Sequence, residues 1–207
     1  MRLSVDSGTI DGDLVVPDGA RGVVCFAHGS GSSRHSTRNK RVAAALQDAD
    51  FATLLFDLLT SHEEVVDERT RALRFDIELL GRRLVLVTDA LAADPRVGTL
   101  PVGYFGASTG AAAALVAAAQ RPSVKAIVSR GGRPDLAGDA LAQVSAPTLL
   151  IVGELDREVL ELNREAAARI PAPTELVIVR GATHLFEEPG ALDEVADLAT
   201  RHFTRYL

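Results

Sequence analysis

The sequence has few of the residues that point to disulfides, thiolate metal sites or nucleic-acid binding. Its 207 residues include one cysteine, Cys25, and no tryptophan. A single cysteine cannot form an intrachain disulfide and disfavours a thiolate metal site. Because Cys25 lies in the apolar run 22–27, we expect it to be a core residue. Acidic residues outnumber basic ones and give a formal net charge of −6, which argues against a nucleic-acid-binding surface.

Long hydrophobic runs are also missing. No apolar run is long enough to span a bilayer, and the first residues lack the apolar core of a signal peptide. We therefore expect a cytoplasmic protein without membrane contact. The chain is 47% hydrophobic and 24% charged, as in ordinary globular proteins, and its length fits one domain over residues 1–207.

Short apolar runs alternate with helical patterns along the chain. Strands are expected at residues 22–27, 52–56, 102–105, 124–129, 148–152 and 176–179. Helices are expected at residues 36–48, 73–91, 110–119, 158–170 and 191–206. Residues 2–6 and 13–16 are predicted to form an opening hairpin, and the acidic stretch 57–68 a surface loop. The alternation predicts an α/β fold, with a mostly parallel sheet covered by helices on both faces and functional groups at the carboxyl ends of strands.

The most informative stretch, residues 101–115, combines an apolar strand, a sharp turn and a helix of small residues. Gly106, Ser108 and Gly110 fit the pattern G-x-S-x-G, in which a serine is held on a strained strand-to-helix turn. Bulky side chains in place of the two glycines would keep the strand and the helix apart. Ser108 is therefore a candidate nucleophile. The alternative is a tightly packed junction that uses the same small residues without a catalytic role.

Two further candidates, Asp156 and His184, each come directly after an expected strand. Since the carboxyl ends of parallel strands share one edge of a sheet, Ser108, Asp156 and His184 should converge there, in the chain order of an α/β-hydrolase. His184 would take the proton of the serine, and Asp156 would orient the imidazole. Glu154 competes for the orienting role, and Asp156 could instead cap the next helix.

Acyl transfer also needs N–H donors for an oxyanion. The expected donors are the backbone N–H of Thr109, directly after the nucleophile, and that of Ser30, in the glycine-serine loop 28–33. The alternative for this loop is phosphate binding. It fits poorly, because G-x-G-x-x-G would require glycine at Arg34 and the chain has no P-loop motif.

Together, residues 28–33, residues 106–110, Asp156 and the segment Gly181–His184 resemble the dienelactone hydrolase-like branch of the α/β-hydrolase superfamily. The resemblance covers nearly the whole chain. It implies an α/β-hydrolase fold with an antiparallel opening strand, and hydrolysis through an acyl-enzyme without cofactor or metal. The namesake enzymes use cysteine where this chain has Ser108, which favours ester, thioester or amide substrates over a dienelactone.

The surroundings of the nucleophile suggest an open site for a small-molecule ester. The segment 129–146 is too short for a cap domain. His28 is a candidate substrate-binding residue. Arg130 and Arg133 follow an expected strand, and Arg130 is a candidate for binding a substrate carboxylate. The alternative for Arg130 is a pairing with Asp135 or another acidic residue that holds its own loop.

The sequence thus predicts a serine esterase. The same triad would also serve an acyl transferase or a perhydrolase, and an inherited site without turnover would make the protein a hydrolase-shaped binding module. The oligomeric state is open, with a homodimer as one option. The other histidines, His35, His62 and His202, are expected to be solvated.

Overall fold

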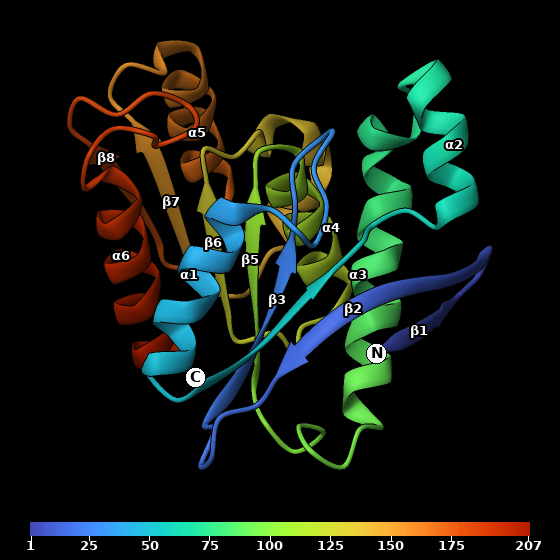
Figure 1. Ribbon diagram of the computed structural model, residues 1–207. Coiled ribbons are helices and arrows are strands. Elements are labelled where there is room, and N and C mark those ends of the chain that lie inside the picture. The colour runs from blue at the N-terminus through green and yellow to red at the C-terminus, as the bar shows by residue number, and fades with distance from the viewer.

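One sheet of eight strands, in the order β1-β2-β4-β3-β5-β6-β7-β8, runs through the molecule. The computed structural model describes all residues from Met1 to Leu207 (Figure 1). The strands are β1 (Arg2–Val5), β2 (Gly8–Val15), β3 (Gly22–Ala27), β4 (Phe51–Phe56), β5 (Val102–Ala107), β6 (Ala126–Arg130), β7 (Thr148–Gly153) and β8 (Thr174–Val179). The β1–β2 and β2–β4 pairs are antiparallel and the others are parallel. Parallel strands β3 to β8 therefore end at one edge, at the top of Figure 1.

Two layers of helices explain why the central strands read as continuous apolar runs. Every residue of β3, β4, β6 and β7 is buried, as expected for strands covered on both faces. The helices are α1 (Thr37–Asp48), α2 (Ser61–Thr70), α3 (Ile77–Ala92), α4 (Thr109–Gln120), α5 (Arg157–Arg169) and α6 (Ala191–Tyr206). Helices α1 and α6 pack on one face of the sheet, and α3 and α4 on the other (Figure 1). The predicted fold class is confirmed.

The long apolar stripe after residue 73 is divided by a cap. A short 3₁₀ turn, Leu73–Phe75, precedes α3. Between them the Asp76 carboxylate accepts a hydrogen bond from the N–H of Leu79 at 2.9 Å, satisfying a donor at the start of the helix. Helix α1 begins in the same way, because the Ser36 hydroxyl accepts from the N–H of Asn39.

The prediction of a loop over residues 57–68 is wrong, because most of this segment forms α2. The helix has no apolar stripe, so hydrophobic periodicity gives no signal for it. It is instead defined by its ends. Thr60 and Glu63 form a reciprocal capping box at the start, and Arg71 adopts a left-handed conformation, with φ of 55°, at the finish.

Three smaller predictions are settled by burial. Cys25 lies in the core as expected, with none of its surface exposed. His35 and His62 are exposed, but His202 is 9% exposed and shares a hydrogen bond with the Pro147 carbonyl, so its predicted solvation is wrong. The opening hairpin forms, although its second strand begins at Gly8. Ile10 and other alternate residues of this strand face inward, a period-two pattern interrupted by too many polar residues to be recognised.

No large cap domain covers the upper edge. The chain between β6 and β7 forms only a short helical segment, Pro134–Gln143, which packs on α4. None of the helices combines the length and apolarity that crossing a bilayer requires.

A fully buried arginine of α3 forms ion pairs with both α2 and the opening hairpin. Arg83, on α3, has no exposed surface. Its guanidinium lies 2.6 Å from the carboxylate of Glu63 and also pairs with Asp6. The Ser7 hydroxyl bridges the same groups, with oxygen-to-nitrogen and oxygen-to-oxygen distances of 2.6 Å. Three segments far apart in sequence therefore meet on one buried charge.

Replacing Arg83 by methionine should lower the free energy of unfolding by about 3 kcal/mol, since it leaves the carboxylate of Glu63 mostly buried and unpaired. Urea denaturation measures this loss. The matched control is Arg82→Met, whose guanidinium is half exposed and 4.0 Å from Asp6, and which should cost under about 0.5 kcal/mol. Equal losses in the two variants would contradict a structural role for the buried pair.

Candidate active site

Ser108 lies on the turn between β5 and α4, with φ of 50° and ψ of −120°. This conformation is costly for a residue other than glycine and persists only where its surroundings hold it. Here the Ser108 N–H donates to the Arg130 carbonyl at 3.2 Å, and the Ser108 carbonyl accepts from the N–H groups of Ala111 and Arg133, each at 3.1 Å. Backbone groups of α4, of the end of β6 and of the loop after β6 thus hold the turn from both sides.

The two glycines of the turn are required by close packing. A Cβ atom at Gly106 would lie 2.4 Å from the Cα of Ala111, and one at Gly110 would lie 2.2 Å from the carbonyl oxygen of Ala27. Both distances are far inside van der Waals contact. The strand-turn-helix interpretation of residues 106–110 therefore matches the structure, and it presents the Ser108 side chain at the upper edge of the sheet.

His184 and Asp156 meet at the same edge. The imidazole Nδ1 of His184 lies 2.6 Å from Oδ2 of Asp156. Asp156 occupies the N-cap of α5 but makes no capping hydrogen bond, so its carboxylate serves the histidine. Glu154 has another partner, the N–H of Gly181 at 2.8 Å. In the structure, Asp156 and not Glu154 is therefore the partner of His184.

Ser108 and His184 line one cavity of about 240 Å³. The Nε2 atom of His184 has no hydrogen-bond partner, and its side chain is 38% exposed. The two side chains are not hydrogen-bonded to each other in this structure. Such bonds are often long in unliganded sites and tighten when substrate binds. The arrangement allows the imidazole to act as a base toward the serine hydroxyl.

The predicted oxyanion donors lie beside the nucleophile. Thr109 is the first residue of α4, so its N–H has no acceptor within the helix. Ser30 lines the cavity from the loop after β3. This loop packs directly on the nucleophile, because a Cβ atom at Gly29 would lie 3.2 Å from the Cβ of Ser108.

His28 is a positioning residue of the loop rather than a free substrate ligand. It is 9% exposed, its Nδ1 lies 3.0 Å from the Gly29 carbonyl, and its Nε2 accepts from the N–H of Leu58 at 3.2 Å. Burial lowers the pKa of His28 below its ordinary value, so the ring is neutral and both nitrogens are used. No ring nitrogen is left for a substrate.

A second cavity, of about 220 Å³, lies next to the first and shares Gly29, Ser30 and Ser32 with it. It is lined by three leucines and by acidic residues of α2. No three His, Cys, Asp or Glu side chains are grouped to hold a metal ion.

Arg130 is buried at the end of β6 without a carboxylate partner. It is 6% exposed. The predicted alternative, a pairing of Arg130 with Asp135, is wrong, because Asp135 binds Arg133 instead, with N–O distances of 2.7 and 2.8 Å. Burial, and secondarily the charge of Arg38, lower the pKa of Arg130 to about 10. The guanidinium is therefore still charged near neutral pH.

No sequence pattern predicts that α1 contributes to this cavity. Ser36, Arg38 and Asn39 line the cavity from the first turn of this helix. In the sequence they read as an ordinary polar helix start, because nothing in a single helix shows which sheet edge its first turn will face. Arg38 pairs with Glu187 at 3.2 Å.

Comparison with known proteins identifies relatives over the whole chain. The sequence model of the dienelactone hydrolase family matches residues 10–207. The crystal structure of dienelactone hydrolase from Anabaena variabilis superimposes with a TM-score of 0.98, at 58% sequence identity, over 100% of this chain and 96% of that one. Est1E from Butyrivibrio proteoclasticus has a TM-score of 0.82 over 99% of this chain and 97% of its own, and its 16% identity supports the fold alone.

Proteins from two strains of Mycobacterium tuberculosis, named for a suggested phosphoribosyl transferase activity, are 63% identical over 199 residues. The match covers 96% of this chain but only 44% of theirs. The chain therefore spans less than half the length of these relatives. The family match extends from β2 to the last residue, and the structure repeats the fold of a dienelactone hydrolase almost completely. This chain belongs to the dienelactone hydrolase family and has the α/β-hydrolase fold.

Proposed function

We propose that the protein is a serine hydrolase that cleaves carboxylic esters, or related acyl compounds, through an acyl-enzyme on Ser108. Family and fold support hydrolase activity. The observation that carries the choice of residues is the 2.6 Å contact of His184 with Asp156 at the cavity that Ser108 lines. Activating a serine hydroxyl requires such a base together with a group that orients it.

In the first half of the reaction, the Ser108 oxygen attacks the acyl carbon while Nε2 of His184 takes the hydroxyl proton. The tetrahedral intermediate then breaks its bond to the leaving alcohol, and His184 returns the proton to that oxygen. In the second half, water attacks the acyl carbon with His184 again as base, and the acid leaves as Ser108 recovers its proton. The Asp156 carboxylate keeps the proton on Nδ1 and stabilises the imidazolium.

The oxyanion of each intermediate is assigned to the N–H groups of Thr109 and Ser30. Thr109 adds the positive end of the α4 dipole to its own N–H. Gly29 supports this assignment, because its small size lets the loop that carries Ser30 approach the nucleophile closely.

The transferase name of the mycobacterial relatives does not conflict with this proposal. The part of those chains that matches this one is 63% identical to a chain that belongs to the dienelactone hydrolase family. We infer that any phosphoribosyl transfer belongs to the remainder of the longer chains.

Ser108→Ala should reduce hydrolysis of a short-chain para-nitrophenyl ester by about 10³-fold or more and leave the fold intact. The initial rate and the circular dichroism spectrum check both parts. Ser123→Ala, at an exposed serine away from the cavity, is the control and should retain full activity. Undiminished turnover in Ser108→Ala would end the proposal.

A fluorophosphonate probe tests the competing view that the protein binds without turnover, since only an activated serine reacts quickly. Rapid labelling of the wild type, absent from Ser108→Ala, is expected. Analysis of the products formed with water, alcohol or peroxide as acceptor separates hydrolysis from acyl transfer and perhydrolysis.

Asp156→Asn should lower kcat by about 10³- to 10⁴-fold, because an amide that replaces the carboxylate favours the wrong tautomer of His184. Steady-state kinetics with the same ester measures the effect. The matched control is Glu154→Gln, which removes a nearby charge but retains an oxygen that can accept from the N–H of Gly181. The control should lose less than about threefold, and the reverse ranking would reassign the orienting role to Glu154.

A further inference from the structure

Arg130 is the one side chain at the cavity whose charge has no counterion. It is 6% exposed, and no carboxylate lies within 4.0 Å of its guanidinium. Its Nε atom is buried and has no hydrogen-bond partner. The nearest aromatic ring, that of Phe186, has its centroid 5.8 Å from Cζ, at the outer limit of a cation–π contact. A buried charge without a partner is expensive, so this position needs a further explanation.

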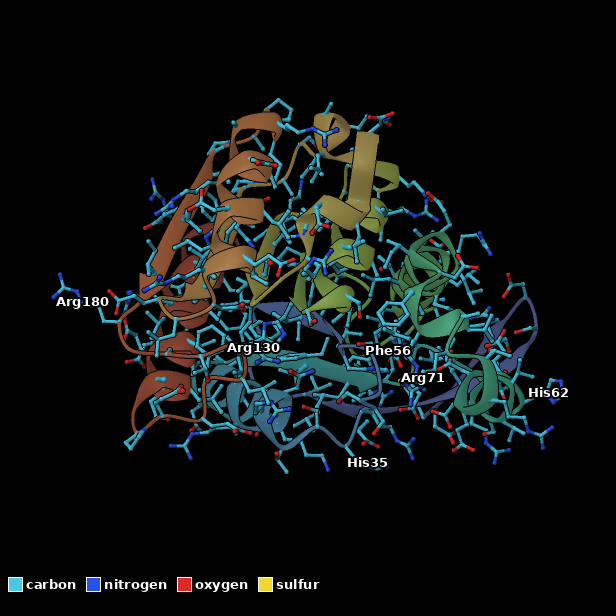
Figure 2. The ribbon with its side chains drawn as sticks, turned by 90° about the horizontal axis from the view of Figure 1, so that it is seen from above. His35, Phe56, His62, Arg71, Arg130 and Arg180 are labelled. Atoms are coloured by element: carbon cyan, nitrogen blue, oxygen red, sulfur yellow. The ribbon has the colours of Figure 1, made fainter.

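The neighbouring groups at the cavity are also donors of positive or polar character. Arg38 faces the cavity from α1, and its charge already lowers the pKa of Arg130. In the first turn of this 12-residue helix, the N–H of Arg38 has no intrahelical acceptor, whereas the N–H of Asn39 donates to the Ser36 hydroxyl. Figure 2, which looks onto the upper edge of the sheet, shows Arg130 near the middle of this edge, whereas His35, His62 and Arg180 lie at its periphery.

The carboxylates of the region are committed elsewhere. Asp156 binds His184, Asp135 binds Arg133, and Glu187 binds Arg38 with 65% of its own side chain exposed. The cavity therefore brings together two guanidinium groups and the amino end of a helix without a buried acid to neutralise them. This combination is characteristic of anion-binding sites in proteins.

We propose that Arg130, Arg38 and the first turn of α1 form an anion subsite for a phosphate monoester group carried by the acyl substrate. The inference rests on the proposed function, since the subsite lines the same cavity as Ser108. It narrows the substrate class from esters in general to esters of small phosphorylated acids or alcohols.

A phosphate monoester fits these donors better than a carboxylate does. Near neutral pH it carries close to two negative charges and three terminal oxygens, which match two guanidinium groups together with helix amides. A carboxylate carries one charge and two oxygens, and one bidentate arginine satisfies it. The Arg38 guanidinium would then have only its pair with the exposed Glu187 carboxylate, and an exposed ion pair of this kind is weak.

The first test compares three para-nitrophenyl esters of matched length, with acyl chains that end in a phosphate monoester, a carboxylate or a methyl group. For the wild type, kcat/KM should be about 10- to 100-fold higher for the phosphorylated ester than for the neutral one, as for charge-assisted hydrogen bonds. The carboxylate ester should fall between them. A carboxylate ester equal to or better than the phosphorylated one, or the absence of any preference, would overturn the assignment.

The second test uses Arg130→Met and Arg38→Met. Each should remove most of the preference for the phosphorylated ester, measured as the ratio of its kcat/KM to that of the neutral ester in the same variant. Arg41→Met is the matched control, because Arg41 lies one turn further along α1, pairs with Asp193 and does not line the cavity. Should Arg130→Met fail to fold, Arg38→Met, whose side chain is 31% exposed, carries the test alone. A preference that survives in Arg38→Met would refute the subsite.

Binding is measured separately from turnover on Ser108→Ala. Inorganic phosphate should raise the melting temperature of this variant at constant ionic strength, and the added Arg130→Met or Arg38→Met change should remove the shift. An Arg-dependent shift without hydrolysis of any ester would uphold the subsite and reject the proposed hydrolase chemistry. Hydrolysis without a shift would do the opposite.

Discussion

The strained, positive-φ backbone of Ser108 is the constraint on which the rest of the site depends. It is held by one hydrogen bond given to Arg130 and two received from Ala111 and Arg133, and by helix packing so close that Gly106 and Gly110 leave no space for a Cβ atom. The conformational cost is offset by contacts of β5, α4 and β6, which form only in the complete sheet. The conformation of Ser108, the proposed nucleophile, therefore depends on the fold as a whole rather than on a local motif.

The loop of Arg130 links this turn to the proposed anion subsite. Its carbonyl holds the N–H of Ser108, while its guanidinium lines the same cavity. One residue thus positions the nucleophile through its main chain and faces the cavity with its side chain. Arg130 is the last residue of β6, and in a strand the carbonyl lies in the plane of the sheet while the side chain stands out of it, so the two groups reach different neighbours.

The alternation of strands and helices along the chain, and the meeting of Ser108, Asp156 and His184 at one edge of the sheet, could be predicted because each depends on a pattern local in sequence: an apolar run, a glycine turn, or a polar residue directly after a strand. Helix α2 has no apolar stripe, so hydrophobic periodicity does not reveal it. Its one local signal is the capping box of Thr60 and Glu63, and its contact with Arg83 exists only in the fold. The same limit applies to His202, which is buried only because α6 packs against the start of β7. Only the three-dimensional structure shows that Asp156, and not Glu154, contacts His184. It also shows that Asp135 pairs with Arg133, so that Arg130 has no carboxylate partner.

The parallel register of β7 and β8 pairs Gly153 with Val179, directly below the two loops that carry Asp156 and His184. A slip of one residue between these strands would displace one loop by about 3.3 Å against the other, more than a hydrogen bond tolerates. The register of β7 and β8 thus determines how far Asp156 lies from His184. A change that shifted this register would therefore separate Asp156 from His184 even though it lay within the sheet and outside the cavity.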